Sequence, residues 1–361
     1  DGKKKKMLNW ININDLNWKV LSKNPNAIDL LRERIQYEKS LTNEELDQLE
    51  NQDKIDWRYL SANPNAIHLL REKIEYEKSL TNQKYKKLKN KIVWKWLSEN
   101  PNGIDLLRER IQYEHFLTKA QYNRLKISHK INWGNLSFNP NAIDLLKANP
   151  DKINYYYLSF NKNAIELLRE RIDYEKLLRE RIKYERSLPF DDKAYWDDTG
   201  YWSEEFDELH YEDNKINWDN LSSNPNAIEL LKENQDRINW NRLSRNPNAI
   251  DLLKENQDKI DWNRLSLNPN AIDLFRERIE YENSLTNEEL YQLYNKIDWE
   301  YLSFVPNAIE LLKENQDKIN WDNLSSNPNA IDLLKTNQAK IYWRSISSNP
   351  SIFEDEPMPT I

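Results

Sequence analysis

The 361-residue sequence contains no cysteine, only four glycines and four histidines, and no long hydrophobic run. The missing cysteines exclude disulfide bonds and thiolate metal sites, and they fit a reducing compartment. Without a run of about 18 apolar residues, we expect no helix that crosses a membrane. The sequence also shows no glycine-rich phosphate-binding loop and no Ser-His-Asp set. We therefore predict no cofactor, no metal site and no enzymatic activity.

The sequence is dominated by a recurring motif, Trp-x-x-Leu-Ser-x-Asn-Pro-Asn-Ala-Ile-x-Leu-Leu. Copies that begin at Trp218, Trp240 and Trp262 lie 22 residues apart. A fixed period of this length is typical of repeat architectures, in which each repeat packs on its neighbours. The other copies begin at Trp18, Trp57, Trp94, Trp133, Tyr155, Trp299, Trp321 and Trp343. A degenerate copy without Asn-Pro fits between Tyr155 and Trp218 if it begins at Trp196, which gives twelve repeats.

Each short repeat predicts two helices and no strand. In one copy, Trp218 and Leu221 share a face of a brief first helix. We expect the second helix to start at Asn224-Pro225, because asparagine caps helices and proline suits the first helical position. This helix should run to about Asn234, a residue that tolerates a left-handed backbone at a helix end. A proline in each repeat and the lack of alternating apolar residues argue against strands.

Five repeats are longer than the others by about 15 to 19 residues; they begin at Trp18, Trp57, Trp94, Tyr155 and Trp262. The extra residues extend the second helix and then open a third, for which Thr42, Thr118 and Thr286 begin capping boxes. The repeat at Tyr155 instead duplicates part of its helix, which Leu188-Pro189 should end. The predicted fold is all-α: an α-solenoid of about twelve two-helix repeats, five of them lengthened by an extra helical hairpin.

We expect a single solenoid over residues 8–350, with the degenerate segment 189–215 as the point where it would break. Residues 1–7 should form a basic N-terminal tail, and residues 351–361 a C-terminal tail. The recurring tryptophan is predicted to fill the core, because stacked helices need large apolar residues at a fixed position. The net charge of −7 does not favour the basic groove that nucleic-acid binding requires, so we do not expect a nucleic-acid partner.

Two other recurring positions have structural interpretations. The acidic residue after Ile, as in Asp29 or Glu229, precedes a basic residue by three positions, as in Arg32 or Lys232. Such pairs neutralise each other on a solvated helix face. The Asn before Pro predicts either a ladder between neighbouring repeats or simple helix caps. Val305 replaces it in one repeat, where a cap worth about 1 kcal/mol should be missing.

The position between Ser and Asn varies while the motif around it stays constant, which indicates an exposed site. Phe138 and Phe160 occupy it in adjacent repeats and predict an apolar patch for a partner, with packing under an inserted helix as the alternative. The acidic, aromatic segment 189–215 is either a docking segment or a strained repeat. The candidate partner-binding residues are Phe138, Phe160, Trp202, Tyr201, Leu267 and Phe304.

The combination of Trp, Leu-Ser, Asn-Pro and Ala-Ile, reiterated over roughly residues 8–353, resembles the Asn-Pro-x-Ala-Ile-x-Leu-Leu repeat proteins of mimivirus-like giant DNA viruses of amoebae. The resemblance implies a viral protein located in the host cytoplasm or the virion. From the repeats we expect a non-enzymatic scaffold that mediates protein–protein interaction, without membrane association. Its partner would be a viral or host protein, or a second copy of the chain. The alternative is a structural component of the virion, such as a minor capsid or packing protein.

Overall fold

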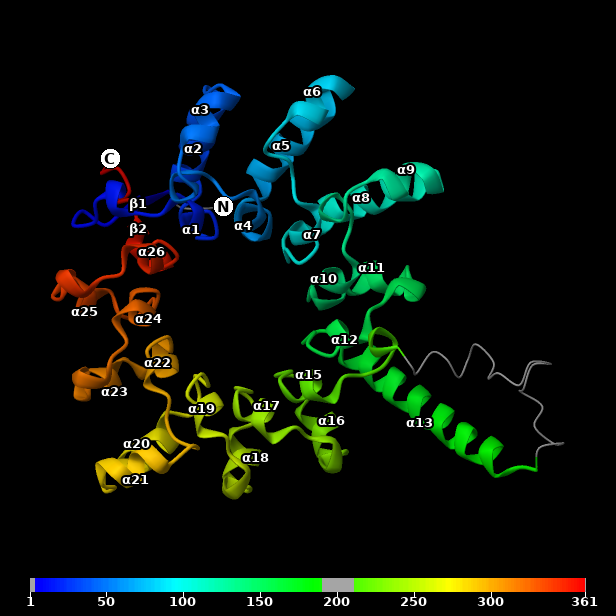
Figure 1. Ribbon diagram of the computed structural model, residues 1–361, viewed down its shortest axis with the longest axis vertical. Helices are drawn as coiled ribbons and strands as arrows, with labels where there is room; N and C mark the ends of the chain where they lie inside the picture. Colours follow the sequence, from blue (N-terminus) through cyan, green and yellow to red (C-terminus); the bar gives the residue numbers. More distant parts are fainter. Residues whose placement is uncertain (1–3, 190–210, 361) are drawn as a thin grey trace. The chain divides into compact units, whose positions relative to one another are not determined.

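The computed structural model describes residues 4–189 and 211–360, which are mostly helical (Figure 1). The chain divides into two compact units. The first unit combines residues 1–131 with residues 261–361, and the second unit contains residues 132–260. Both are built from short helices in a regular repeating pattern, and the described residues contain 25 α-helices. None of these helices is long and apolar enough to span a bilayer.

The first helix of each repeat starts at the recurring aromatic residue. The residue before it often supplies the cap: the side chain of Asn17 accepts a hydrogen bond from the backbone N–H of Val20, and Asn217 does the same for Asn220. In the first unit these helices are α1 Trp18–Leu21, α4 Trp57–Ala62, α7 Trp94–Leu97, α19 Trp262–Leu265, α22 Trp299–Leu302, α24 Trp321–Ser325 and α26 Trp343–Ile346. In the second unit they are α10 Trp133–Phe138, α12 Tyr155–Leu158, α15 Trp218–Ser222 and α17 Trp240–Ser244.

The second helix starts at the isoleucine of Asn-Pro-Asn-Ala-Ile, so the predicted start at Asn-Pro is wrong by several residues. In the first unit these helices are α2 Ile28–Lys39, α5 Ile67–Ser79, α8 Ile104–Phe116, α20 Ile272–Asn283, α23 Ile309–Glu314 and α25 Ile331–Lys335. In the second unit they are α11 Ile143–Lys147, α13 Ile165–Ser187, α16 Ile228–Lys232 and α18 Ile250–Lys254. The Asn224 side chain accepts a hydrogen bond from the N–H of Asn226 at 3.1 Å, which closes a turn before the helix.

The end of the second helix in the short repeats also differs from the prediction. Asn234 has φ −137°, which is not left-handed, and its side-chain amide donates to the carbonyl of Leu230 at 2.9 Å. A 3₁₀ turn, Gln235–Arg237, follows it. Equivalent turns follow the other short second helices: Pro150–Lys152, Gln257–Lys259, Gln316–Lys318 and Gln338–Lys340. The sequence analysis missed these turns.

The lengthened repeats follow the prediction closely. Their third helices are α3 Asn43–Gln48, α6 Asn82–Lys87, α9 Lys119–Arg124 and α21 Asn287–Gln292. The capping boxes at Thr42, Thr118 and Thr286 are all formed. The long helix α13 ends at Ser187, directly before Leu188-Pro189 as predicted. These boundaries were predictable because they depend on local backbone sterics and on side chains within one turn.

The constant polar residues of the motif form a ladder between neighbouring repeats. Within each unit, the motif asparagine donates to two backbone carbonyls of the neighbouring repeat, as Asn63 does to Ser22 at 3.1 Å and to Asn24 at 3.0 Å. The serine hydroxyl accepts the N–H of the next repeat, as Ser22 does from Asp56 at 3.0 Å. Of the two interpretations of this asparagine, the ladder is therefore correct. Val305 has no side-chain amide. The hydrogen bonds missing there are therefore those of the ladder between repeats and not those of a helix cap.

The ladder also fixes the order of the repeats in the second unit. Asn224, in the repeat at Trp218, donates to the carbonyls of Ser159 and Asn161 at 3.1 and 3.0 Å. The repeats at Tyr155 and Trp218 are therefore direct neighbours. The expectation that a repeat beginning at Trp196 stands between them in the stack is wrong, and residues 190–210 themselves lie outside the described part of the chain.

In the first unit, the two ends of the chain pack on each other. Strand β1, Lys5–Met7, pairs with strand β2, Phe353–Asp355, in an antiparallel sheet that places Lys6 opposite Glu354 (Figure 1). The expectation of no strand is therefore wrong. The two strands lie within the segments 1–7 and 351–361 that the sequence assigned to tails.

The ladder continues across this junction between the chain ends. Asn24 donates to the carbonyls of Ser347 and Asn349 at 3.0 and 2.9 Å, and the hydroxyl of Ser347 accepts the N–H of Asn17 at 2.8 Å. The first repeat thus contacts the last through the same bonds that join covalently consecutive repeats. We call the contact between residues 4–26 and 343–356 the seam.

The core of each repeat consists of the motif leucines, the alanine and the isoleucine that precedes the recurring aromatic residue. Leu221, Ala227 and Leu231 are fully buried, for example. None of the recurring aromatic side chains in the described residues is exposed; Trp57 and Trp94 are buried and the others are half-buried. The tryptophan is therefore packed as predicted, although most copies lie at the margin of the core rather than at its centre.

Candidate functional site

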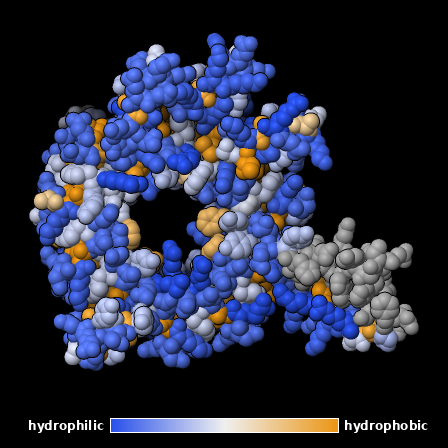
Figure 2. Space-filling model, in the orientation of Figure 1, coloured by the Kyte–Doolittle hydropathy of each residue, from blue (hydrophilic) through white to orange (hydrophobic). Residues whose placement is uncertain are grey.

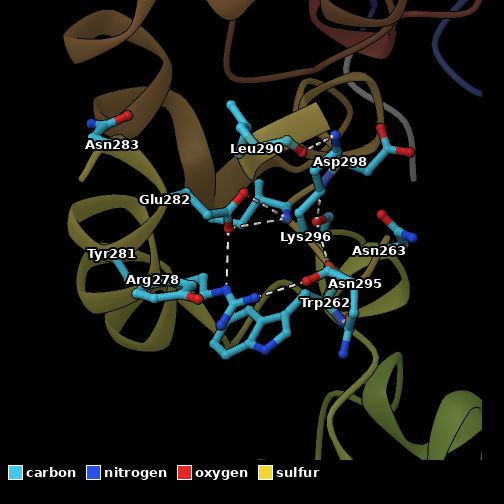
Figure 3. Close-up of polar contacts among 12 residues, drawn as sticks. Trp262, Asn263, Arg278, Tyr281, Glu282, Asn283, Leu290, Asn295, Lys296 and Asp298 are labelled. Carbon is cyan, nitrogen blue, oxygen red and sulfur yellow. Dashed lines mark hydrogen bonds and ion pairs between the residues drawn. The ribbon is translucent and has the colours of Figure 1, made fainter. Parts of the chain in front are cut away.

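The lengthened repeats contain a buried cluster of charged residues, shown for one repeat in Figure 3. The guanidinium of Arg278 lies over the ring of Trp262, 4.8 Å from its centroid, and its Nε is 3.2 Å from Oε2 of Glu282. Its Nη2 donates to the carbonyl of Asn295 at 2.8 Å. The carboxylate of Glu282 accepts the backbone N–H of Ile297, which leads into the next repeat. The cluster therefore fastens the inserted hairpin at both of its ends.

The same cluster recurs in the other four lengthened repeats, where the sequence reads Arg/Lys-Ile-x-Tyr-Glu directly after the start of the second helix. Glu38, Glu77, Glu114 and Glu175 accept the N–H of Ile55, Ile92, Ile131 and Ile216. The cation four residues earlier lies over the recurring aromatic ring in each case: Arg34 over Trp18, Lys73 over Trp57, Arg110 over Trp94 and Arg171 over Tyr155. In most short repeats, a cation from the 3₁₀ turn takes this place, as Arg237 does over Trp218.

Burial dominates the electrostatics of these glutamates. It raises the pKa of Glu38 from 4.5 to about 7, against the opposing effects of the Ile55 N–H and of Arg34. Burial likewise raises the pKa of Glu77, Glu114, Glu175 and Glu282. Because each carboxylate is engaged with backbone N–H groups, we assign the clusters to structure rather than to chemistry.

The charges on the outer faces follow two patterns. Glu229 and Lys232 pair within one helix at 3.5 Å, as predicted. Arg32 does not pair with Asp29 but with Glu72 of the next repeat at 3.0 Å, so the prediction is wrong for this pair. Arg276 and Glu314 also join neighbouring repeats, at 3.3 Å. Among the described residues, no group of three or more acidic and histidine side chains is placed to hold a metal ion.

The structure brings Phe138 and Phe160 together. Phe138 ends α10 and Phe160 follows α12, and their rings meet edge to face with centroids 6.1 Å apart. Phe138 is 43% exposed and Phe160 is half-buried. Phe138, with 43% of its surface exposed, is not packed under an inserted helix.

The other candidate residues lie elsewhere. Leu267 and Phe304 belong to the first unit, where Leu267 is half-buried and Phe304 is exposed. Tyr201 and Trp202 lie outside the described residues. Phe138 and Phe160 are therefore the two candidates for which the structure shows a direct mutual contact.

The sequence analysis missed two tyrosines on α12, the helix that Phe160 follows. Tyr157 is 39% exposed, and its ring packs edge to face against that of Tyr156, with centroids 5.2 Å apart. A Cβ atom at Gly134 would lie only 2.9 Å from Cδ2 of Tyr157, so glycine is needed for this tyrosine to sit against α10. A glycine in a chain with so few of them was the available signal. We call Phe138, Tyr156, Tyr157 and Phe160 the aromatic cluster.

The surface in Figure 2 is dominated by hydrophilic residues, and hydrophobic residues appear on it as small separate patches. Against this background, the two edge-to-face pairs, Phe138 with Phe160 and Tyr156 with Tyr157, are a distinct chemical feature.

Comparison of the chain with known protein families, with curated proteins and with solved structures finds no match. The resemblance to giant-virus repeat proteins, and the location that it implies, therefore stay predictions.

Proposed function

We propose that the protein is a non-enzymatic scaffold whose repeats form a solenoid and whose aromatic cluster binds a protein partner. The observation that carries the proposal is the edge-to-face pair of Phe138 and Phe160, with Phe138 43% exposed in a position that varies between repeats. The serine and asparagine of the motif hardly vary, because their side chains form the ladder. The position between them varies, and no bond of the ladder explains the large exposed aromatic residue that it carries at Phe138.

Aromatic side chains suit this role because they offer a large contact area at a small cost in conformational entropy. Tyr156 and Tyr157 add hydroxyl groups beside the two phenylalanines. The cluster thus combines an apolar surface with polar edges, which is the composition of energetically important protein interfaces. The partner that fits it presents aliphatic or aromatic side chains with hydrogen-bonding groups around them.

The test is site-specific photo-crosslinking with benzoylphenylalanine in place of Phe138, in extracts of cells that naturally express the protein. A matched control carries the probe at Phe116, which is 88% exposed and lies in the first unit. We expect a discrete cross-linked protein from position 138 that is absent from position 116 and is lost when Phe160→Ser is added. Equal cross-linking from both positions, or none from position 138, would contradict the proposal.

A further inference from the structure

A pocket of about 320 Å³ lies in the first unit, where the starts of three successive repeats meet. Five cationic side chains line it: Lys19 of α1, Lys54 and Arg58 beside and within α4, and Lys89 and Lys91 before α7. Asp56 supplies the one carboxylate in its lining. The pocket is therefore strongly basic in a chain whose net charge is −7.

Two of the five cations already have carboxylate partners. Arg58 pairs with Asp56 at 2.8 Å, and Lys89 pairs with Asp47. Lys19, Lys54 and Lys91 form no ion pair within the described residues. Against the effect of burial, the positive charges of Lys54 and Lys91 lower the pKa of Glu38 and of Glu77, and the ammonium of Lys91 lies over the ring of Tyr85, 4.6 Å from its centroid. The lining still carries five positive side chains against one carboxylate.

The surrounding sequence adds to this field. Residues 84–130 contain twelve lysines and arginines but only four acidic residues. The pKa of His129 is lowered mainly by burial, and the positive charges of Lys91, Lys126 and Arg110 lower it further.

The fold forms a pocket at an equivalent place elsewhere in the first unit, but the lining there is not basic. An equivalent pocket of about 690 Å³ lies between the last two repeats of the first unit, against Asn320, Trp321 and Asp322. Its lining contains one base, Lys340, and one acid, Asp322. The basic residues around Trp57 are therefore not required to build a pocket of this kind.

We propose that the basic pocket binds a compact polyphosphate. Several lysine ammonium groups arranged around one space are side chains that recognise phosphate oxygens. The volume is at the lower end of the range for small-molecule sites, which suits a ligand of two or three phosphate groups. Bound phosphate would add negative charge to a lining that holds five cationic side chains and one carboxylate.

The geometry favours a compact ligand over a nucleic acid. Binding of single strands relies on exposed aromatic rings on which bases stack. The aromatic ring of the pocket, Trp57, is 9% exposed, and the ammonium of Lys73 lies over it at 4.7 Å. No stacking surface is thus left at Trp57.

The experiment is calorimetric titration of the full chain with inorganic tripolyphosphate at low salt. Lys54→Gln/Lys91→Gln removes two of the five positive charges that line the pocket. Lys232→Gln/Lys313→Gln is the matched control, because these exposed lysines lie outside the pocket and pair with Glu229 and Glu310. We expect affinity for tripolyphosphate to fall by about tenfold or more in the pocket variant and to stay unchanged in the control. If the pocket variant fails to fold, Lys19→Gln/Arg58→Gln takes its place.

Three results would overturn the proposal. The first is no binding of tripolyphosphate, or binding that is equal in the pocket variant and the control. The second is citrate binding as tightly as tripolyphosphate, which would show a general anion effect. The third is a single-stranded oligonucleotide that binds more tightly than tripolyphosphate and loses its affinity in the same pocket variant.

Discussion

At the scale of single residues, the constant asparagine and serine of the motif are explained by hydrogen bonds between repeats. Asn327 is fully buried; its amide donates to the carbonyls of Ser303 and Val305 at 3.1 and 3.0 Å, and its oxygen accepts the N–H of Asn329 at 3.0 Å. A buried carbonyl without a donor costs free energy, so Asn327 satisfies two groups that water cannot reach. Aspartate or serine could not supply the two donors.

We therefore expect Asn327→Ala to lower the free energy of unfolding by about 3 kcal/mol, since three hydrogen bonds disappear and two buried carbonyls lose a donor. The matched control is Asn329→Ala, whose amide makes one exposed bond to the carbonyl of Pro306 at 3.0 Å. This control should cost less than about 1 kcal/mol. Urea unfolding curves measure both, and equal losses would show that the ladder is not the stabilising feature.

Glu38 predicts a pH dependence of stability. Its pKa is raised from 4.5 to about 7 on folding, so between these values the folded chain binds a proton that the unfolded chain does not. The resulting stabilisation is complete below the lower value and is lost as the pH rises through the upper one. Glu38→Gln imitates the protonated form and keeps an acceptor for the N–H of Ile55.

Relative to the wild type, Glu38→Gln should gain stability between about pH 5 and about pH 8, by up to about 3 kcal/mol. The control is Glu33→Gln, an exposed residue on the same helix, for which we expect no such trend. Chemical unfolding at several pH values measures the difference. A gap between Glu38→Gln and wild type that does not change with pH would refute the assignment.

At the scale of helices and strands, sequence reasoning succeeded where the signal is local. The third helices and the end of α13 follow from capping boxes and from Leu188-Pro189. It failed where residues distant in sequence decide the outcome. Asn224 does not cap the second helix, because that helix starts only at Ile228; its oxygen accepts the N–H of Asn226, and its amide donates to carbonyls of the preceding repeat. Strands β1 and β2 form from segments at opposite ends of the chain, and no local sequence pattern predicts them.

The candidate site shows the same division. The contact of Phe138 with Phe160 was predictable, because both occupy one position in adjacent repeats. The role of Gly134 in seating Tyr157 depends on the distance between α10 and α12, which the sequence does not contain. The buried glutamates were missed for a similar reason: Glu282 acts on the N–H of Ile297, fifteen residues later.

The helix α21 offers a test at this scale. Thr286 Oγ1 accepts the N–H of Glu289 at 3.1 Å, and the Glu289 carboxylate accepts the N–H of Thr286 at 3.3 Å. Thr286→Val removes the first bond while keeping the side-chain shape, and should destabilise the helix by about 1 kcal/mol. Hydrogen exchange at the amides of α21 should speed up, whereas Glu288→Gln, an exposed acid of the same turn, should leave it unchanged. Unaltered exchange in Thr286→Val would mean that packing alone holds the hairpin.

At the scale of the whole molecule, the seam joins residues from the two ends of the chain. It is therefore the contact that the sequence alone made hardest to predict. Repeat proteins expose an unpaired face at each end of a stack unless something covers it. In the first unit, the first and last repeats cover each other, with Asn24 as a rung of the ladder and Lys5 paired with Asp355 at 2.6 Å. Removing the residues of either strand should therefore destabilise repeats at both ends of the chain.

A disulfide across the seam tests this directly, because the chain has no other cysteine. The backbone bonds of Leu8 to Ile352 and of Glu356 to Lys4 leave Lys5 and Asp355 as a non-hydrogen-bonded pair, whose side chains lie close enough to bridge. We expect Lys5→Cys/Asp355→Cys to form an intrachain disulfide and, when oxidised, to unfold at a higher urea concentration than when reduced. The chain-entropy estimate for so long a loop is about 6 kcal/mol. Lys5→Ser/Asp355→Ser controls for the lost ion pair and should not respond to oxidation. Disulfides that form only between molecules, or an oxidised variant no more stable than the reduced one, would show that the two ends of the chain do not meet as the structure places them.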